Sequence, residues 1–207
     1  MATLKSLINE IEQLCKKELA TLGFYRKRGV FIKDIDSGNL GWLGLNRATY
    51  KAEGVVDVHP VVGIINTEVE QLASTWSGSN VVRDFSPTVT EPLYFLITGG
   101  KYISWRFFQN GNTAGIVHNL REAVSDYGLP VMEKLGDKSI LLEWLLGRPG
   151  KLNEAYNRYR IPAVYVLLGE KEKAREYIRS VLEQLSEDPN PYQKQWSEKY
   201  AEVMLKI

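Results

Sequence analysis

The segment 22–64 constrains the fold of this chain more than any other part of the sequence. Three stretches rich in apolar and β-branched residues, 30–35, 40–49 and 55–64, are separated by short polar or glycine-containing segments. The first connection, 36–39, reads Asp-Ser-Gly-Asn, and these residues tolerate the backbone angles of a hairpin turn. The segment therefore predicts a three-stranded antiparallel meander.

The stretch 55–64 alternates in a way that assigns its residues to two sheet faces. Successive side chains of a strand point to opposite faces, so Asp57 and His59 share one face. Pro60 donates no ladder hydrogen bond, and we expect it at a sheet edge or a bulge. The residues expected to supply much of the core are Trp42, Leu43, Leu45, Val56, Val58 and Ile64.

Helices and a second hairpin are predicted around this meander. Apolar residues three and four apart predict an amphipathic helix over 4–22, and Thr67 with Glu70 forms a capping-box pattern before a helix over 67–77. Segments 92–97 and 102–109 flank Thr-Gly-Gly-Lys at 98–101, which indicates a second β-hairpin. The sheet should therefore contain about five strands.

From Thr113 onward the pattern is helical. Gly128 is positioned as the residue after a helix end, and Pro162 is expected to restart the chain before a helical hairpin that turns at Gly169. We therefore expect an α+β fold with an N-terminal helix, an antiparallel sheet and a helical C-terminal half. The expected division is a sheet-bearing body over 1–128 and a helical extension packed on it over 129–207.

The overall charge and the single cysteine narrow the classes of partner and compartment. The formal net charge is only +1, so no global field attracts nucleic acid or an anionic membrane, and we expect neither as a partner. Cys15 is the only cysteine, which excludes an internal disulfide, and it is expected to be a small buried residue. No apolar run has the length of a membrane span and the start lacks a signal-peptide layout, so we expect a cytoplasmic protein.

No catalytic or metal-binding motif is recognisable. Asp57 and His59 on one strand face are the best candidates for a general base with an orienting carboxylate, and Arg106 could complete a pocket between sheet and helices. Polar residues more often mark a solvated sheet face. We therefore expect no catalytic residues, metal or cofactor, and keep an enzyme or small-ligand protein with a pocket at Asp57, His59 and Arg106 as the alternative.

Two groups of residues are candidates for binding. Arg26, Lys27 and Arg28, with Lys16 and Lys17 nearby, could bind an anion or RNA, but the favoured interpretation is a charged edge strand that discourages edge pairing. Aromatic and arginine side chains dominate protein-binding hot spots. On that basis the candidate binding residues are Tyr25, Arg26, Tyr102 and Arg106.

The sequence Leu22-Gly23-Phe24, followed by basic residues at 26–28, Gly29 and Phe31, resembles the opening of a widespread bacterial family of uncharacterised domains. The resemblance covers roughly residues 4–65 and implies no activity. Domains of this kind are often encoded beside polymorphic toxins as immunity proteins. The resemblance therefore implies a noncatalytic, protein-binding role in which a cytoplasmic bacterial protein neutralises a cognate toxin.

Overall fold

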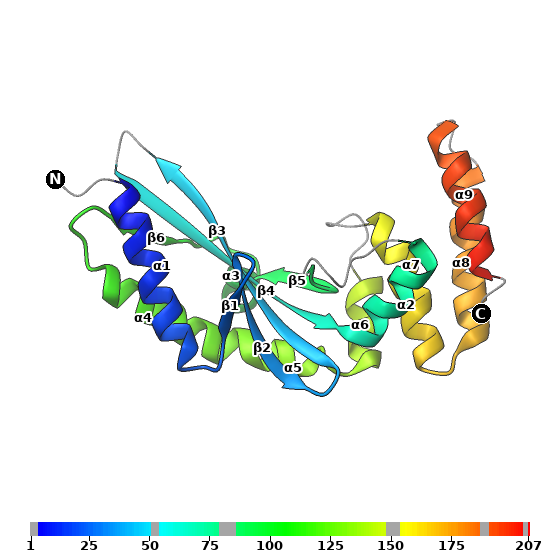
Figure 1. Cartoon of the computed structure of the whole chain (residues 1–207), viewed down its shortest axis with the longest axis horizontal. Coiled ribbons are helices and arrows are strands. Elements are labelled where there is room, and N and C mark those ends of the chain that lie inside the picture. Colours follow the sequence, from blue (N-terminus) through cyan, green and yellow to red (C-terminus); the bar gives the residue numbers. More distant parts are fainter. Residues whose placement is uncertain (1–3, 51–53, 79–85, 148–153, 187–190, 205–206) are drawn as a thin grey trace. The chain divides into compact units, whose positions relative to one another are not determined.

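The computed structural model describes residues 4–50, 54–78, 86–147, 154–186, 191–204 and 207. It has the expected α+β architecture, with an N-terminal helix, an antiparallel sheet and helices in the C-terminal half. The chain forms two compact units: residues 1–65 and 90–134 belong to the first, and residues 66–89 and 135–207 to the second. Each unit is described separately below (Figure 1).

The sheet confirms the predicted meander and extends it at both edges. Strands follow the order β1-β2-β3-β4-β5, and β6 also pairs with β4. The expected turn at 36–39 joins β2 to β3. The sequence Ala-Glu-Gly at 52–54 also predicts a turn before the third strand, and most of it lies outside the described residues. The strands are β1 (Tyr25–Lys27), β2 (Val30–Asp36), β3 (Asn39–Tyr50), β4 (Val55–Asn66), β5 (Val89–Pro92) and β6 (Trp105–Phe108).

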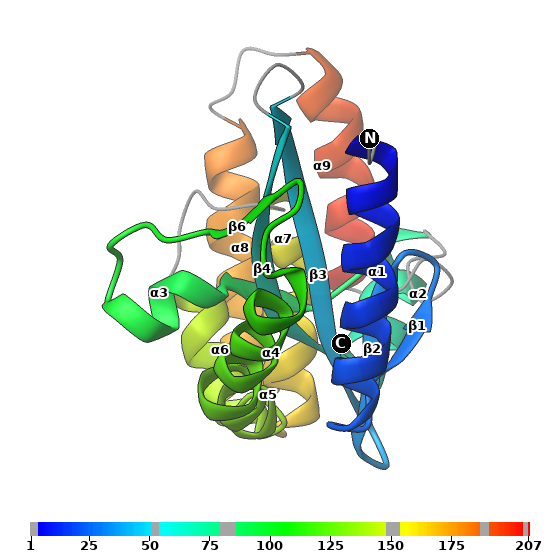
Figure 2. The same cartoon turned by 90° about the vertical axis from the view of Figure 1, so that its left-hand side faces the viewer.

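One face of the sheet is covered by two helices of the same unit. Figure 2 shows α1 (Leu4–Ala20) and α4 (Thr113–Ala123) side by side in front of β3 and β4. The register pairs Val56 with Phe107 and Val58 with Trp105, and these side chains enter one apolar core with residues of both helices. Cys15 lies in this core, fully buried, and burial raises the pKa of its thiol to about 12.

The expected core residues are only partly correct. Leu43, Val56, Val58 and Ile64 are completely buried, whereas Leu45 is partly buried against the core. Trp42 is half-buried and lies on the opposite sheet face from Leu43. The strand register shows this, since Leu43 pairs with the core residue Phe31 and Trp42 pairs with Ile32. Adjacent residues of a strand point to opposite faces, so Trp42 and Leu43 cannot share one core.

The predicted second hairpin is wrong. Residues 93–98 form a short helix, α3 (Leu93–Thr98), which ends at Gly99 in the left-handed conformation. Leu93, Leu96 and Ile97 all contact the core, which is a helical spacing of three and four rather than a strand alternation. Strand β6 consequently pairs with β4 instead of with 92–97.

Gly128 does not end the helix before it, and Pro60 does not lie at a sheet edge. The helix that begins at Thr113 continues through a π-helical turn, η2 (Val124–Gly128), into α5 (Leu129–Lys134). Pro130 lacks an N–H, and a π turn accommodates this local break in the hydrogen-bond ladder. Gly128 is buried where an added Cβ would lie 3.1 Å from Val62. Pro60 lies in β4, which has neighbours on both sides, and not at a sheet edge.

The second unit is built from helices. Helices α2 and α6 both pack against α7, α7 packs against α8, and α8 packs against α9. Helix α2 also contacts α9. Pro162 lies inside α7 and does not restart the chain as expected, while the predicted hairpin between α7 and α8 does turn at Gly169. The helices are α2 (Thr67–Ser77), α6 (Lys138–Leu146), α7 (Glu154–Leu167), α8 (Lys171–Ser186) and α9 (Pro191–Met204).

The expected capping box at the start of α2 is shifted by one residue. Asn66 is the N-cap, and its side-chain oxygen accepts a hydrogen bond from the backbone N–H of Val69. Glu70 therefore lies one position too far along to complete the box. It is instead fully buried, with its Oε1 2.8 Å from Nε of the buried Arg160 on α7.

Candidate functional site

The sheet face opposite α1 and α4 carries a carboxylate on β4 and an arginine on β6 that bind each other. Asp57 of β4 lies opposite Arg106 of β6 in the strand register. Nε and Nη2 of Arg106 donate to the two carboxylate oxygens of Asp57, each over 2.8 Å. These hydrogen bonds hold the pKa of Asp57 below its ordinary value, against the opposing effect of burial. The Asp57 side chain is 3% exposed, whereas that of Arg106 is 54% exposed.

His59 lies on the same strand face, as predicted, but its partner is a tyrosine. The hydroxyl of Tyr102 is 2.9 Å from Nδ1 of His59, and the two rings are 5.5 Å apart. Tyr94, from α3, meets the Tyr102 ring edge-on at 5.3 Å. The side chains expected to form a dyad are thus each engaged by a different residue, Asp57 by Arg106 and His59 by Tyr102.

These contacts join residues of four segments into one exposed surface of the first unit. Phe108 lies two positions from Arg106 on β6, so both side chains point to the same sheet face. Tyr102 is 61% exposed and Phe108 is 50% exposed. We call this the aromatic–arginine surface and define it by His59, Tyr94, Tyr102, Arg106 and Phe108.

The arrangement offers little to acid–base or metal chemistry. Both oxygens of Asp57 accept hydrogen bonds from a guanidinium, which favours the ionised carboxylate and leaves it a weak proton acceptor. Within the part of the chain that the structure describes, no three His, Cys, Asp or Glu side chains are grouped so that they could hold a metal ion. Arg106 also borders an open hollow whose other lining residues come from 103–105, from Asn112 and from α4.

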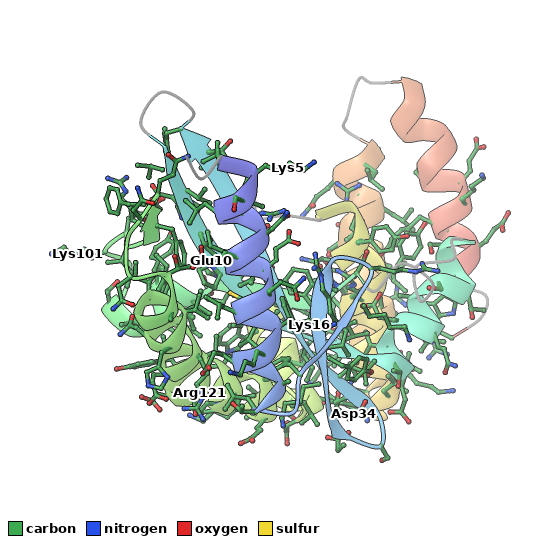
Figure 3. The ribbon with its side chains drawn as sticks, turned by 60° about the vertical axis from the view of Figure 1, so that its left-hand side comes forward. Lys5, Glu10, Lys16, Asp34, Lys101 and Arg121 are labelled. Atoms are coloured by element: carbon green, nitrogen blue, oxygen red, sulfur yellow. The ribbon has the colours of Figure 1, made fainter. Side chains whose placement is uncertain are left out.

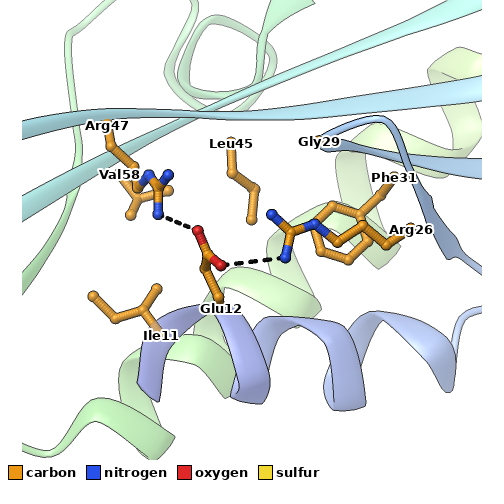
Figure 4. A pocket seen from close by; sticks show the side chains of 8 residues that line it. All are labelled: Ile11, Glu12, Arg26, Gly29, Phe31, Leu45, Arg47 and Val58. Carbon is orange, nitrogen blue, oxygen red and sulfur yellow. Dashed lines mark hydrogen bonds and ion pairs between the residues drawn. The ribbon is translucent and has the colours of Figure 1, made fainter. Parts of the chain in front are cut away.

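A second polar cluster lies between α1 and the sheet. Glu12 of α1 stands between Arg26 of β1 and Arg47 of β3, at 3.2 Å and 2.5 Å (Figure 4). Burial raises the pKa of Glu12, but the hydrogen bonds from Arg47 and Arg26 outweigh it and lower the pKa below its ordinary value. The cluster borders a small cavity of about 40 Å³ whose other walls include Ile11, Phe31 and Leu45.

The four candidate binding residues therefore divide between two surfaces. Tyr25 and Arg26 lie on β1 at one edge of the sheet, and Tyr102 and Arg106 lie beside β4 and β6 on the other side of the meander. Tyr94 was missed because its segment was expected to be a strand. The pairing of Glu12 with Arg47 joins residues far apart in sequence, and no local pattern indicates it.

Comparisons of the chain with protein-family models, curated proteins and solved structures found no match. None of the helices in the described ranges is long and apolar enough to cross a membrane.

Proposed function

We propose that this chain is a noncatalytic protein-binding protein and that the aromatic–arginine surface contacts its partner. The observation that carries the proposal is the grouping of exposed aromatic rings around an arginine held in a fixed orientation. Aromatic residues and arginine are the side chains most enriched in the energetically dominant centres of protein interfaces.

The geometry of Arg106 supports such a role. Two parallel hydrogen bonds to Asp57 fix the guanidinium plane, while more than half of the side chain stays exposed. An arginine fixed in this way loses little conformational freedom when a partner binds, which lowers the cost of association. Tyr102 is similarly restrained by His59 and Tyr94.

The same contacts weigh against the alternative of an active site at Asp57, His59 and Arg106. A general base must reach the proton that it removes, and the Asp57 carboxylate is almost completely buried beneath its arginine partner. The alternative of a small-ligand protein predicts instead that a metabolite binds beside Arg106.

The more specific proposal is that the partner is a bacterial toxin domain and that the chain is a cytoplasmic immunity protein. It rests on the sequence resemblance over residues 4–65, and the aromatic–arginine surface provides the contact residues. An inhibitor of this kind needs to cover its target over an interface of about 1,200 Å² or more.

The proposal is tested by affinity purification of the tagged chain from its native host, with quantitative comparison of wild type, Tyr102→Ala and Phe108→Ala. Both side chains are at least half exposed, so their truncation should leave the fold intact. We expect one stoichiometric protein partner with wild type and its loss with either variant. A toxin domain as that partner, and protection of cells that express it, would support the immunity role.

Tyr127→Ala is the matched control, because Tyr127 is an exposed tyrosine of the same unit outside the aromatic–arginine surface. It should retain the partner. Recovery of no protein partner, together with a small metabolite released on denaturation, would contradict the proposal and favour the ligand-binding alternative.

A further inference from the structure

A basic groove runs between α1 and β1 at the edge of the sheet, away from the aromatic–arginine surface. Lys16 and Lys17 line one side from α1, and Arg26 and Arg28 line the other from β1 and the turn that follows it. Figure 3 labels Lys16 on α1 beside β1 and Lys101 on the far side of the same unit.

The two lysines face the groove because of their spacing on the helix. Leu7, Ile11, Cys15 and Leu19 form the buried stripe of α1, and the groove residues of α1 lie on a neighbouring stripe. Among the residues that the structure describes, Lys16 and Lys17 have no acidic partner within ion-pair distance. Their charge is therefore available to a ligand.

Two arginines and two aromatic rings complete the groove. Arg26 is bound by Glu12, which orients its guanidinium, and Arg28 adopts a left-handed backbone conformation at the tip of the turn. Phe24 forms a buried apolar floor, and Tyr25 is 42% exposed beside it. Asp34 of β2 is close enough to influence Tyr25 electrostatically, but it does not line the groove.

The groove is lined by basic side chains although the chain as a whole is nearly neutral. Of the described residues that line it, Lys16, Lys17, Arg26 and Arg28 are basic and none is acidic, and Glu12, which binds Arg26, lies outside the lining. The net charge of the whole chain is only +1. From the sequence, the net charge of +1 favoured a charged edge strand over a site for an anion or RNA, because net charge does not show how the cations are distributed.

We infer that this groove binds single-stranded nucleic acid, with the four cations contacting phosphates and Tyr25 stacking on a base. A positive groove that follows the backbone, combined with an exposed aromatic ring, is the usual arrangement in proteins that bind single strands without sequence preference. This activity is independent of the protein-binding role proposed above.

An acidic peptide fits the groove less well. Addition of a peptide strand to an exposed sheet edge depends on a row of main-chain hydrogen bonds. The edge strand here, β1, has only three residues, Tyr25–Lys27, and offers few such bonds. Phosphates spaced along a flexible backbone can reach cations on both walls without any register.

The test is fluorescence anisotropy with the full chain and a labelled oligouridylate of about 12 nucleotides, titrated between 50 and 200 mM KCl. Contacts with four phosphates predict a slope of about −3 in the plot of log affinity against log salt. Lys16→Gln combined with Lys17→Gln should make the slope about 1.4 units shallower and weaken binding about tenfold or more at low salt. Tyr25→Ala should weaken binding about fivefold or more, and Tyr25→Phe should not.

Lys101→Gln combined with Lys134→Gln is the charge-matched control, since both lysines are exposed on the same unit and neither lines the groove. It should bind like wild type, and circular dichroism should show that every variant is folded. No binding at 50 mM KCl, or equal weakening by the control, would overturn the inference. Binding of an oligoglutamate peptide in preference to oligouridylate, with loss in the same groove variants, would also overturn it and assign the groove to an acidic protein segment.

Discussion

At the scale of single residues, the partners of polar side chains decide what those side chains do. Asp57 and His59 share a strand face, which alternation predicts, but the sequence does not show that Arg106 and Tyr102 would lie opposite them. Both partners are more than 40 positions away along the chain. The sequence therefore predicts that Asp57 and His59 share one sheet face, but it does not predict which side chains bind them.

The ion pair of Asp57 with Arg106 makes a pH-dependent prediction. In the folded protein the pKa of the Asp57 carboxyl is lower than its ordinary value of 3.8. The ion pair therefore stabilises the fold fully above pH 3.8, and this stabilisation is lost as the pH falls through the folded-state pKa of Asp57. Asp57→Asn should lower the free energy of unfolding at pH 7 by about 1 kcal/mol, a modest amount because Arg106 is half exposed. Urea unfolding at pH 7 and pH 3 should show the difference from wild type shrinking at the lower pH.

Asp126→Asn serves as the control, because Asp126 is exposed on η2 of the same unit. Its unfolding midpoint should match wild type at pH 7. An Asp57→Asn difference that grows on acidification would contradict the assigned sign.

The buried ion pair of Glu70 with Arg160 should contribute far more to stability than an exposed ion pair whose glutamate also lies on α2. Both side chains are at most 2% exposed, and Nη2 of Arg160 also donates to the backbone oxygen of Pro87 at 3.0 Å. Glu70→Ala leaves a buried guanidinium uncompensated, which should cost about 3 to 5 kcal/mol in the free energy of unfolding. Glu68→Ala, which breaks the exposed pair with Lys138, should cost at most about 1 kcal/mol. A similar loss of unfolding free energy in the two variants would show that burial does not make the pair of Glu70 and Arg160 more important for stability.

At the scale of elements, long strands with alternating residues were predictable and short segments were not. The meander has three strands of seven or more residues, so its pattern repeats enough to be unambiguous. The six residues of α3 are apolar throughout most of their length, and a run this short fits a strand or a helix equally well. Gly128 and Pro162 were expected to end helices, yet tertiary packing carries the helix through both.

Two leucines that strand alternation places on the same sheet face differ in their burial. Leu43 is completely buried and Leu45 only partly, although both point toward α1 and α4. Leu43→Ala should therefore cost about 2 to 5 kcal/mol, and Leu45→Ala clearly less, because the void left near solvent is partly open to water. Chemical denaturation of the two variants side by side measures this ranking, and the reverse order would contradict the assigned packing.

At the scale of the whole molecule, long-range contacts place chain segments in one unit that the local sequence pattern assigns to different parts. The sequence suggested a division at residue 128, whereas the contacts place residues 66–89 in one unit with residues 135–207. Helix α2 packs against α7 and α9, and it carries the acidic partner of Arg160. No periodicity along the chain indicates which distant segment will complete a buried charge pair.

This grouping predicts that residues 135–207 do not fold stably alone. Without α2, the fragment lacks the apolar surface of Val69, Ala73 and Trp76 and leaves Arg160 without Glu70, a combination that removes both burial and charge compensation. We expect reduced helicity by circular dichroism and no cooperative thermal transition. A peptide spanning residues 66–89 should restore helicity when added, and the same peptide with Glu70→Ala should restore it less, because only the first peptide supplies the carboxylate. Cooperative unfolding of the fragment alone would show that α2 is not part of the core of this unit.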